Sequence, residues 1–429
     1  MVCFRTSENK LFLRDKYIPN MLSLILGTLA GCILGCISGI IPGIHSNTIA
    51  GLAAAFAVPL GFVFGVEGVC CMIVSTMVVH TFLDCVPSTF IGVPDPDTVL
   101  SVLPAHRMYL KGHGEEAIRI SALGSLFGFV FCLPIFALFY YVLPQFQGSI
   151  DWVIGLIILL ASVILIVFSK TPLWSLFIFL VCGALGVFSM YFSYLSFGVF
   201  GSGEVLLPLL SGLFGIPVLL FAITRAGTVV PQKYEGLGTN WREIAASTAK
   251  GTAAGAIVGW LPGFSSGIAN AILSIRKKGV DFEEGRPHGY LLSTSAANTA
   301  NAVLGIAALY AVGRMRSGSM AALASFELPN IFLMLAAAGV AALFGYFATV
   351  ALSRSGKMFA RINQKGLSIA VLIFLVVLTA LFCGPFGLFI LVLASAVGMV
   401  PPILGISRLY GMGVIMIPVM LFTLGILSF

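Results

Sequence analysis

The chain has 429 residues, of which 59% are hydrophobic and only 9% are charged, and this balance excludes a soluble globular domain. The formal net charge of +7 does not indicate nucleic acid binding, because the basic residues lie in short connections between apolar runs, where positive-inside retention places them. Apolar runs of roughly 20 residues, each long enough to cross a bilayer, recur from end to end. The sequence therefore predicts an all-α polytopic membrane protein with about 10–13 membrane helices.

The nine cysteines give no sign of a metal site. They lie singly or inside apolar runs, without a C-x-x-C pair and without a second His/Cys cluster that would complete a site. Cys32 and Cys36 share a helix face, and we assign them to packing. We therefore expect no metal and no cofactor, apart from a coupling proton or sodium ion.

The chain begins with a mixed polar lead, residues 1–20, which is too long and too acidic for a cleavable signal. The first membrane repeat, 21–224, follows, and its polar residues 98–119 should lie on the membrane surface. A polar link, 225–250, leads to the second membrane repeat, 251–429. The expected spans are 21–41, 48–64, 66–92, 118–144, 151–169, 171–192, 205–224, 291–313, 328–352, 367–383, 385–406 and 408–428.

Two short stretches, displaced by 220 positions without a gap, are copies of one another. They read Gly31, Gly35, Gly39, Pro42, Gly43, Ser46 and Gly251, Gly255, Gly259, Pro262, Gly263, Ser266. Small residues at every fourth position make a flat helix face, and Pro-Gly then breaks the apolar run. A broken helix at membrane depth survives only where it lines a polar cavity or is buried in protein. Paired breaks in two halves point to the binding site of a transporter.

The residues at and after each break are the expected substrate-binding residues, because exposed amides and helix N-termini can bind an anion. They are Gly39, Pro42, Gly43, His45, Ser46, Asn47 and Thr48 in the first copy and Gly259, Pro262, Gly263, Ser265, Ser266 and Gly267 in the second. His45 is the only ionisable group inside either break. Hydrogen bonding to a substrate and a satisfied interior histidine both fit it.

Basic residues flank the second break, at 225–250 and 276–290, so both of its ends should face the cytoplasm and form a re-entrant hairpin. If the first copy is also re-entrant, five spans separate the copies, and an odd number makes the repeat inverted. The same count places the basic N-terminal lead outside, against the positive-inside rule. Of the two assignments we favour the inverted repeat.

Asp84 is the sharpest single candidate, because a carboxyl group within an apolar run is costly and therefore functional by default. His80 lies four residues earlier on the same helical face, and such a pair can relay protons or answer a coupling cation. The alternative is that Asp84 lies near the membrane surface beside Pro87 and caps or ties a loop.

Asn298 and Asn301 lie three apart in an unusually polar run, and their amides can coordinate a cation or bind a carboxylate or phosphate. Hydrogen bonding between helices explains them equally well. Arg314 and Arg316 end the same run and can attract an anion, although positive-inside anchoring fits at least as well.

The stretch Gly263-Phe264-Ser265-Ser266-Gly267 fits the G-x-S-x-G elbow of serine hydrolases, which needs a preceding strand. A glycine-rich helix precedes it here, and the first copy has His45 in the frame of Ser265, so the repeat explains the spacing better. An intramembrane serine hydrolase that uses Ser265 with His80 or another histidine is a remote alternative. Otherwise we expect no catalytic residues and no enzyme.

Gly35-x-x-x-Gly39-x-x-Pro42-Gly43, repeated at Gly255 to Gly263, resembles the paired signature of the large membrane subunit of tripartite tricarboxylate transporters. Residues 103–114 are similar to that family's polar loop after the first repeat, and Ser295 to Asn301 to its asparagine-bearing segment. The likeness covers most of the chain up to about residue 325. It implies a permease of the cytoplasmic membrane that moves carboxylates with a cation gradient. A small membrane subunit and an extracytoplasmic binding protein normally serve such a permease.

The chain departs from the family pattern at residues 311–316, where a second Gly-Ile-Pro-Gly turn is usual, and at His45-Ser46-Asn47, where small glycine-rich residues are usual. These departures indicate a divergent branch. The Pro-Gly pattern is also similar to membrane proteins that return polyprenyl-phosphate carrier lipids across the bilayer, an alternative that needs a lateral opening to lipid. Both readings make the substrate an anion and the bilayer a partner; a homodimer is compatible with either, and nucleic acid with neither.

Overall fold

The structure is a computed structural model of the chain. It describes residues 21–41, 44–91, 102–169, 171–199, 201–202, 205–224, 230–259, 287–315, 317–356, 364–406 and 408–427. The predicted N-terminal lead and residues 92–101 lie outside these residues, as does most of the second Pro-Gly element.

The part predicted as the first membrane repeat contains α2 (Met21–Ile40), α3 (Ser46–Ala55), α4 (Ala57–Leu83), α5 (Cys85–Ile91), α6 (Val102–Leu110), α7 (Gly114–Val167), α8 (Pro172–Tyr191), η1 (Ser193–Leu195), α9 (Leu206–Leu210), the π-helical turn η2 (Ser211–Gly215) and α10 (Ile216–Thr224). The second comprises α11 (Trp241–Val258), α13 (Pro287–Val312), α14 (Gly318–Ala324), α15 (Ile331–Leu352), α17 (Gln364–Ile403), η3 (Arg408–Met412) and α18 (Gly413–Thr423). Two short antiparallel strands, β1 (Phe197–Gly198) and β2 (Gly201–Ser202), form a hairpin after α8.

Among the described residues, seven helices are long and apolar enough to cross a membrane, and three shorter apolar helices accompany them. They are Met21–Ile40, Ala57–Phe90, Gly114–Phe146, Pro172–Tyr191, Pro287–Val312, Ile331–Leu352 and Lys365–Ile403. This confirms the prediction of an all-α, multi-pass membrane protein.

Several predicted span boundaries fall at special backbone positions. Gly65, which separates the expected spans 48–64 and 66–92, has φ 67° and ψ 165° within α4. Gly384 has φ 61° and ψ −155° within α17 and precedes Pro385, so the two spans expected there are two helical segments joined without a loop. A positive φ is open to glycine at little cost, which is why the chain bends at these positions.

Elsewhere the helices run further than expected. The predicted spans 118–144 and 151–169 are parts of one 54-residue helix, α7. The polar residues between them interrupt the apolar run, but they do not prevent the backbone hydrogen bonds of a helix. Residues 241–250, which we assigned to the polar link, form the first turns of α11 because the Asn240 side chain accepts a hydrogen bond from the Glu243 N–H and caps the helix.

The glycine repeat is also a repeat of packing. Gly31 and Gly35 of α2 lie against Met72 and Thr76 of α4, while Gly251 and Gly255 of α11 lie against Ser293 and Ala297 of α13. The contacted residues are again separated by a constant interval, 221 positions. Small residues therefore serve the same purpose in both halves, which is to bring one helix backbone directly against another.

The direction of these contacts shows how the halves are oriented. Contacts of α2 ascend along α4 from Gly27 on Gly68 to Gly39 on Leu83, so these two helices are parallel. In the same way α11 is parallel to α13.

Helix α7 links the two pairs of helices. Its start, Gly114, lies against Phe90 of α5, and Ser125 further along donates to the carbonyl of Thr81, so α7 is antiparallel to α4. Gly124 and Gly128 of α7 contact Leu292 and Ala296 in ascending order, so α7 is parallel to α13. Hence α4 and α13 run in opposite directions, as an inverted repeat requires. The predicted re-entrant hairpins stay a prediction, since the Pro-Gly residues of both breaks lie outside the described residues.

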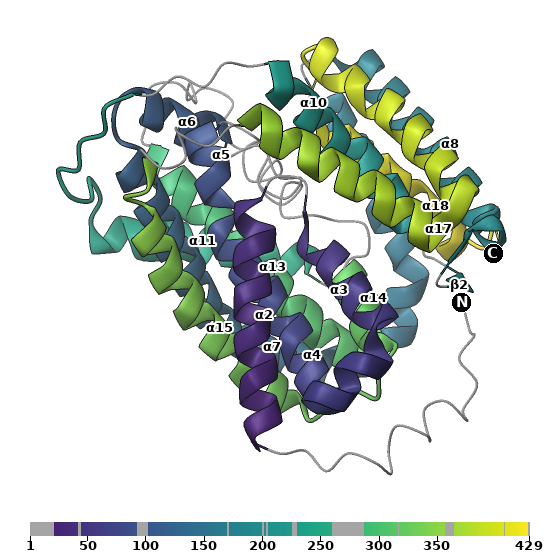
Figure 1. Cartoon of the computed structure of the whole chain (residues 1–429), viewed down its shortest axis with the longest axis horizontal. Coiled ribbons are helices and arrows are strands. Elements are labelled where there is room, and N and C mark those ends of the chain that lie inside the picture. The colour runs from purple at the N-terminus through teal and green to yellow at the C-terminus, as the bar shows by residue number, and fades with distance from the viewer. Residues whose placement is uncertain are drawn as a thin grey trace.

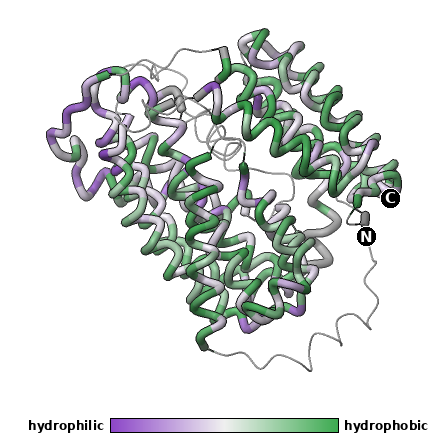
Figure 2. Tube along the Cα trace, in the orientation of Figure 1, coloured by the Kyte–Doolittle hydropathy of each residue, from purple (hydrophilic) through white to green (hydrophobic). Residues whose placement is uncertain are grey.

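The helices gather around two main apolar cores. The larger core joins α2–α5, the first part of α7 and α13–α15. The second joins the end of α7 with α8, η2, α17 and α18, which lie together in Figure 1. Figure 2 shows the hydrophilic segments concentrated beside α6 and the link before α11.

The paired glycine contacts predict matched effects of added methyl groups. A Cβ at Gly35 would lie 2.6 Å from the Cβ of Val79, and a Cβ at Gly255 would lie 2.6 Å from the carbonyl oxygen of Ala297. Gly35→Ala and Gly255→Ala should each destabilise the protein by about 1–3 kcal/mol through overpacking. Thermal melting of the purified protein in detergent measures this. Gly51→Ala is the control, because nothing lies within 4 Å of a Cβ there; an equal loss at Gly51 would contradict the packing argument.

Candidate functional site

A buried polar cluster lies where α4 of the first half crosses α13 of the second. The Asn298 side-chain amide donates to Asp84 Oδ2 over 2.7 Å, and the hydroxyl groups of Thr81 and Thr299 are 3.0 Å apart. Asp84 and Asn298 are each only 3% exposed. Asp84 is the C-cap residue of α4 and lies in the protein interior, where it joins the two halves. The alternative, that it caps or ties a loop near the membrane surface, stays a prediction.

Two histidines extend this cluster toward the first break. The Nδ1 atom of His80 lies 3.1 Å from the Ser38 hydroxyl of α2, and the ring of His80 lies 4.6 Å from the ring of His45. His80 is one helical turn from Asp84 and contacts His45, so the three ionisable residues are neighbours.

His45 caps helix α3. Its Nδ1 atom accepts a hydrogen bond from the Asn47 N–H over 3.1 Å, and the Ser46 hydroxyl lies 3.3 Å from the same atom. Because a backbone N–H can only donate, Nδ1 must be unprotonated in this arrangement, and the proton of a neutral ring is on Nε2.

Asn47 connects the first break to the second half. Its Oδ1 atom accepts from both the N–H and the hydroxyl of Ser319, each over 3.0 Å. The first turn of α3 therefore lies directly against the start of α14, two short helices that lie side by side in Figure 1. On its other side the break packs through Ile44 against the apolar side chains of α10 and α17.

The remaining predicted residues divide into four groups. Thr48 and Asn301 are buried, while Gly39 and Gly259 are contact points against Leu83 and Leu304. Arg314 is partly buried after the end of α13, and this burial lowers the pKa of its guanidinium. The predictions for Pro42, Gly43, Pro262, Gly263, Ser265, Ser266, Gly267 and Arg316 lie outside the described residues.

Sequence reasoning missed the small hydroxyl residues of the cluster, because Ser38, Thr81 and Ser125 look like ordinary helix residues in a chain rich in small residues. Ser125 donates to the carbonyls of both Thr81 and Ser295 and so touches both halves. Ser38 lies directly before Gly39, within the run of repeated glycines that signalled helix packing only.

Sequence reasoning also missed a network of charged residues at the start of α7. Glu116 accepts from the Gly238 N–H over 2.7 Å and lies 3.1 Å from Nε2 of His288, while Glu115 pairs with Arg354 over 3.3 Å. These contacts join α7, the link before α11 and the ends of α13 and α15. Two adjacent acids directly after a glycine-rich turn were the available signal.

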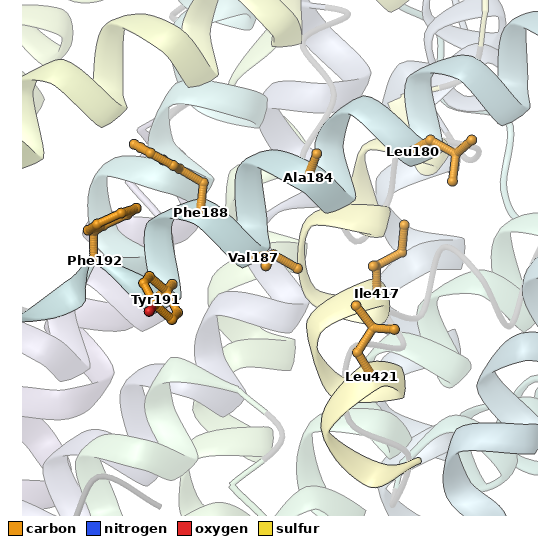
Figure 3. Close-up of a pocket in the computed structure, with 8 residues that line it drawn as sticks. All are labelled: Leu180, Ala184, Val187, Phe188, Tyr191, Phe192, Ile417 and Leu421. Atoms are coloured by element: carbon orange, nitrogen blue, oxygen red, sulfur yellow. The ribbon is translucent and has the colours of Figure 1, made fainter. Parts of the chain in front are cut away.

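An apolar groove lies elsewhere, between α8 and α18 (Figure 3). Its volume is about 510 Å³, and Leu180, Phe188 and Ile417 are among its lining residues. Tyr191 carries the only side-chain polar atom in its lining. The groove belongs to the second core and contains no group that would bind an anion, so the polar cluster is the stronger candidate site.

The central helices of the two halves run in opposite directions, and ionisable groups are buried where these helices cross, which is the arrangement expected of an inverted-repeat membrane transporter. The chain belongs to the tripartite tricarboxylate transporter TctA family, whose match covers residues 25–413. This confirms the resemblance seen in the glycine-rich signatures.

One curated relative extends this comparison. An uncharacterized protein of Methanocaldococcus jannaschii is 29% identical over 205 residues, which are 47% of this chain and 48% of the relative. The match thus spans about half the length of that protein. No solved structure matches the chain.

The contact between the halves predicts a stability effect. Asn298→Ala removes a donor from a buried carboxylate, and a hydrogen bond to a charged group is worth about 1.5–3 kcal/mol. We expect a lower melting temperature for this variant. Ser293→Ala is the control on the same helix, because the Ser293 hydroxyl bonds only the carbonyl of Tyr290 in its own turn. Equal melting of the two variants would show that the Asp84–Asn298 contact does not stabilise the fold.

Proposed function

We propose that the protein is a secondary transporter that moves a small organic anion, a carboxylate, across the cytoplasmic membrane by alternating access. The observation that carries this proposal is the hydrogen bond from Asn298 to Asp84 at the crossing of α4 and α13. Burying an ionisable group between two inverted halves costs free energy, and such a group in a membrane protein is therefore expected to have a function. Membership in a transporter family supports the same conclusion and gives no support to the hydrolase alternative.

The anion site is proposed to lie at the first break, where α3 begins. The N-terminus of α3 carries the positive end of the helix dipole, and the His45 ring and the buried Ser46 and Thr48 side chains surround it. Asn301 of the second half supplies a buried amide on the same helix as Asn298. Arg314, and Arg316 beyond it in sequence, would attract the anion before it enters.

The proposed coupling groups are His80 and Asp84. Uptake of a proton or a sodium ion at this pair would change the charge at the crossing of the two halves, and a change of charge there would alter which arrangement of the halves is favoured. One group of helices then rocks or slides against the other.

The family resemblance supports two protein partners, a small membrane subunit and an extracytoplasmic binding protein. A homodimer fits the same architecture. Translocation of a polyprenyl-phosphate lipid stands as the alternative, and the apolar groove between α8 and α18 does not favour it, because the groove offers no polar group for a phosphate head.

Ligand-induced stabilisation tests the substrate class. Melting of the purified protein is measured with a panel of di- and tricarboxylates, with a neutral sugar as the control, because a ligand that binds only the folded state raises the melting temperature. We expect at least one carboxylate to raise it and the sugar to leave it unchanged. A shift with a polyprenyl phosphate and with no carboxylate would instead support lipid translocation.

Asp84→Asn tests the coupling role. This variant should abolish gradient-driven carboxylate uptake into vesicles while leaving exchange of internal for external carboxylate intact, because an amide cannot change its charge. Glu235→Gln, at an exposed position of the link, is the matched control and should leave both activities unchanged. Equal loss of uptake and exchange in Asp84→Asn would argue against a coupling role.

A further inference from the structure

The two halves have equivalent packing but different chemistry at their centres. The contacts of the repeated glycines match Met72 to Ser293, Thr76 to Ala297, Val79 to Ala300 and Leu83 to Leu304. The same interval of 221 positions makes Asn301 the counterpart of His80 and Gly305 the counterpart of Asp84. Each ionisable residue of α4 at the crossing thus has a counterpart in α13 that cannot titrate.

The neighbours of these residues differ in the same way. His80 lies 3.1 Å from the Ser38 hydroxyl of α2, whereas the residue of α11 at the place of Ser38 is Val258, which has no polar side chain. Asp84 bonds Asn298, whereas their counterparts, Gly305 and Met77, can form no such bond. The polar contact is therefore made once where the repeat would allow it twice.

Few titratable groups face His80 from the surrounding elements that the structure describes. His45 comes from the first break, and Asp84 follows α4 with Cys85 beside it. Among the described residues, α2 contributes the thiols of Cys32 and Cys36, and α15 contributes the phenol of Tyr346. Asn298 and Asn301 of α13 are neutral, and α14 has no titratable residue. The acids of α7 lie at its start, beside Phe90 and more than one turn beyond Asp84.

We propose that coupling uses protons and is confined to the first half, with His80 as the group that carries one proton per transport cycle. This inference rests on the proposed function and specifies its coupling ion and stoichiometry. The imidazole gains one N–H bond on one side of the membrane and loses it on the other, and Asp84 provides the negative charge that accompanies the proton. Asn301 preserves the shape of the crossing in the second half without a proton of its own.

An exchange of residues between the halves tests this. His80→Asn gives the first half the residue of the second, and Asn301→His gives the second half the residue of the first. In proteoliposomes with citrate as the probe, proton uptake is followed with a trapped pH dye and citrate with a radiolabel. We expect the wild type to take up one proton per citrate transport cycle. His80→Asn should lose at least tenfold in proton uptake while its citrate exchange stays within twofold of the wild type. Asn301→His should show a steeper pH dependence of citrate uptake.

Two results would overturn the inference: proton uptake that persists in His80→Asn, or two cooperative protons per cycle in the wild type. His80→Gln, which keeps a side chain able to reach Ser38, is the second variant for the case that His80→Asn does not fold.

A measurement without substrate separates this inference from the proposed function. The chain has five histidines, so ¹⁵N-histidine NMR of the purified protein gives few imidazole signals, and the one missing in His80→Asn is that of His80. We expect this signal to change its chemical shift with pH, because an imidazole that carries a proton in the cycle must change its charge. A titrating His80 without any citrate exchange would leave the proton site standing and refute citrate transport. Citrate exchange with a His80 that does not titrate would refute the proton site alone.

Discussion

The arrangement of the helices around the polar cluster depends on one constraint, which is that the neighbouring helices α2 and α4 run in the same direction. Their backbones meet at glycines along most of α2, so the chain must travel back between the end of one helix and the start of the closely packed part of the other. Of this return the structure describes residues 44–65. A helix of ten residues such as α3 is only about 15 Å long, so the return is made of short pieces, and short pieces have helix ends inside the protein.

Those internal helix ends determine where polar chemistry is tolerated. The amides at the start of α3 need acceptors, and the chain supplies His45 for one of them and places Asn47 against Ser319 of the second half. Close to the start of α3, α4 and α13 cross in opposite directions. Polar residues of both halves therefore lie together at this crossing. The close glycine contacts and the buried charges are thus two results of the same topology.

The sequence contained more of the fold than of the site. The apolar runs predicted the spans, and Gly65 and Gly384 lie at predicted boundaries because a positive φ there needs glycine. The glycine interval predicted a repeat, and its packing role followed from the small side chains. What the sequence could not show is which helix contacts which: nothing in the spacing of Asp84 and Asn298 indicates that they meet. The sequence pattern also could not show that α7 continues through polar residues. Polar residues indicate where a chain leaves the membrane, but they do not prevent the backbone hydrogen bonds of a helix.

The cap of α3 has a chemical consequence of its own. One lone pair on Nδ1 of His45 holds the Asn47 N–H, and that same lone pair is where a second proton would bind to the ring. Protonation of the ring and capping of α3 therefore compete for the lone pair on Nδ1 of His45. A second proton can bind to this imidazole only if Nδ1 releases the Asn47 N–H, so protonation of His45 and capping of α3 by His45 exclude one another.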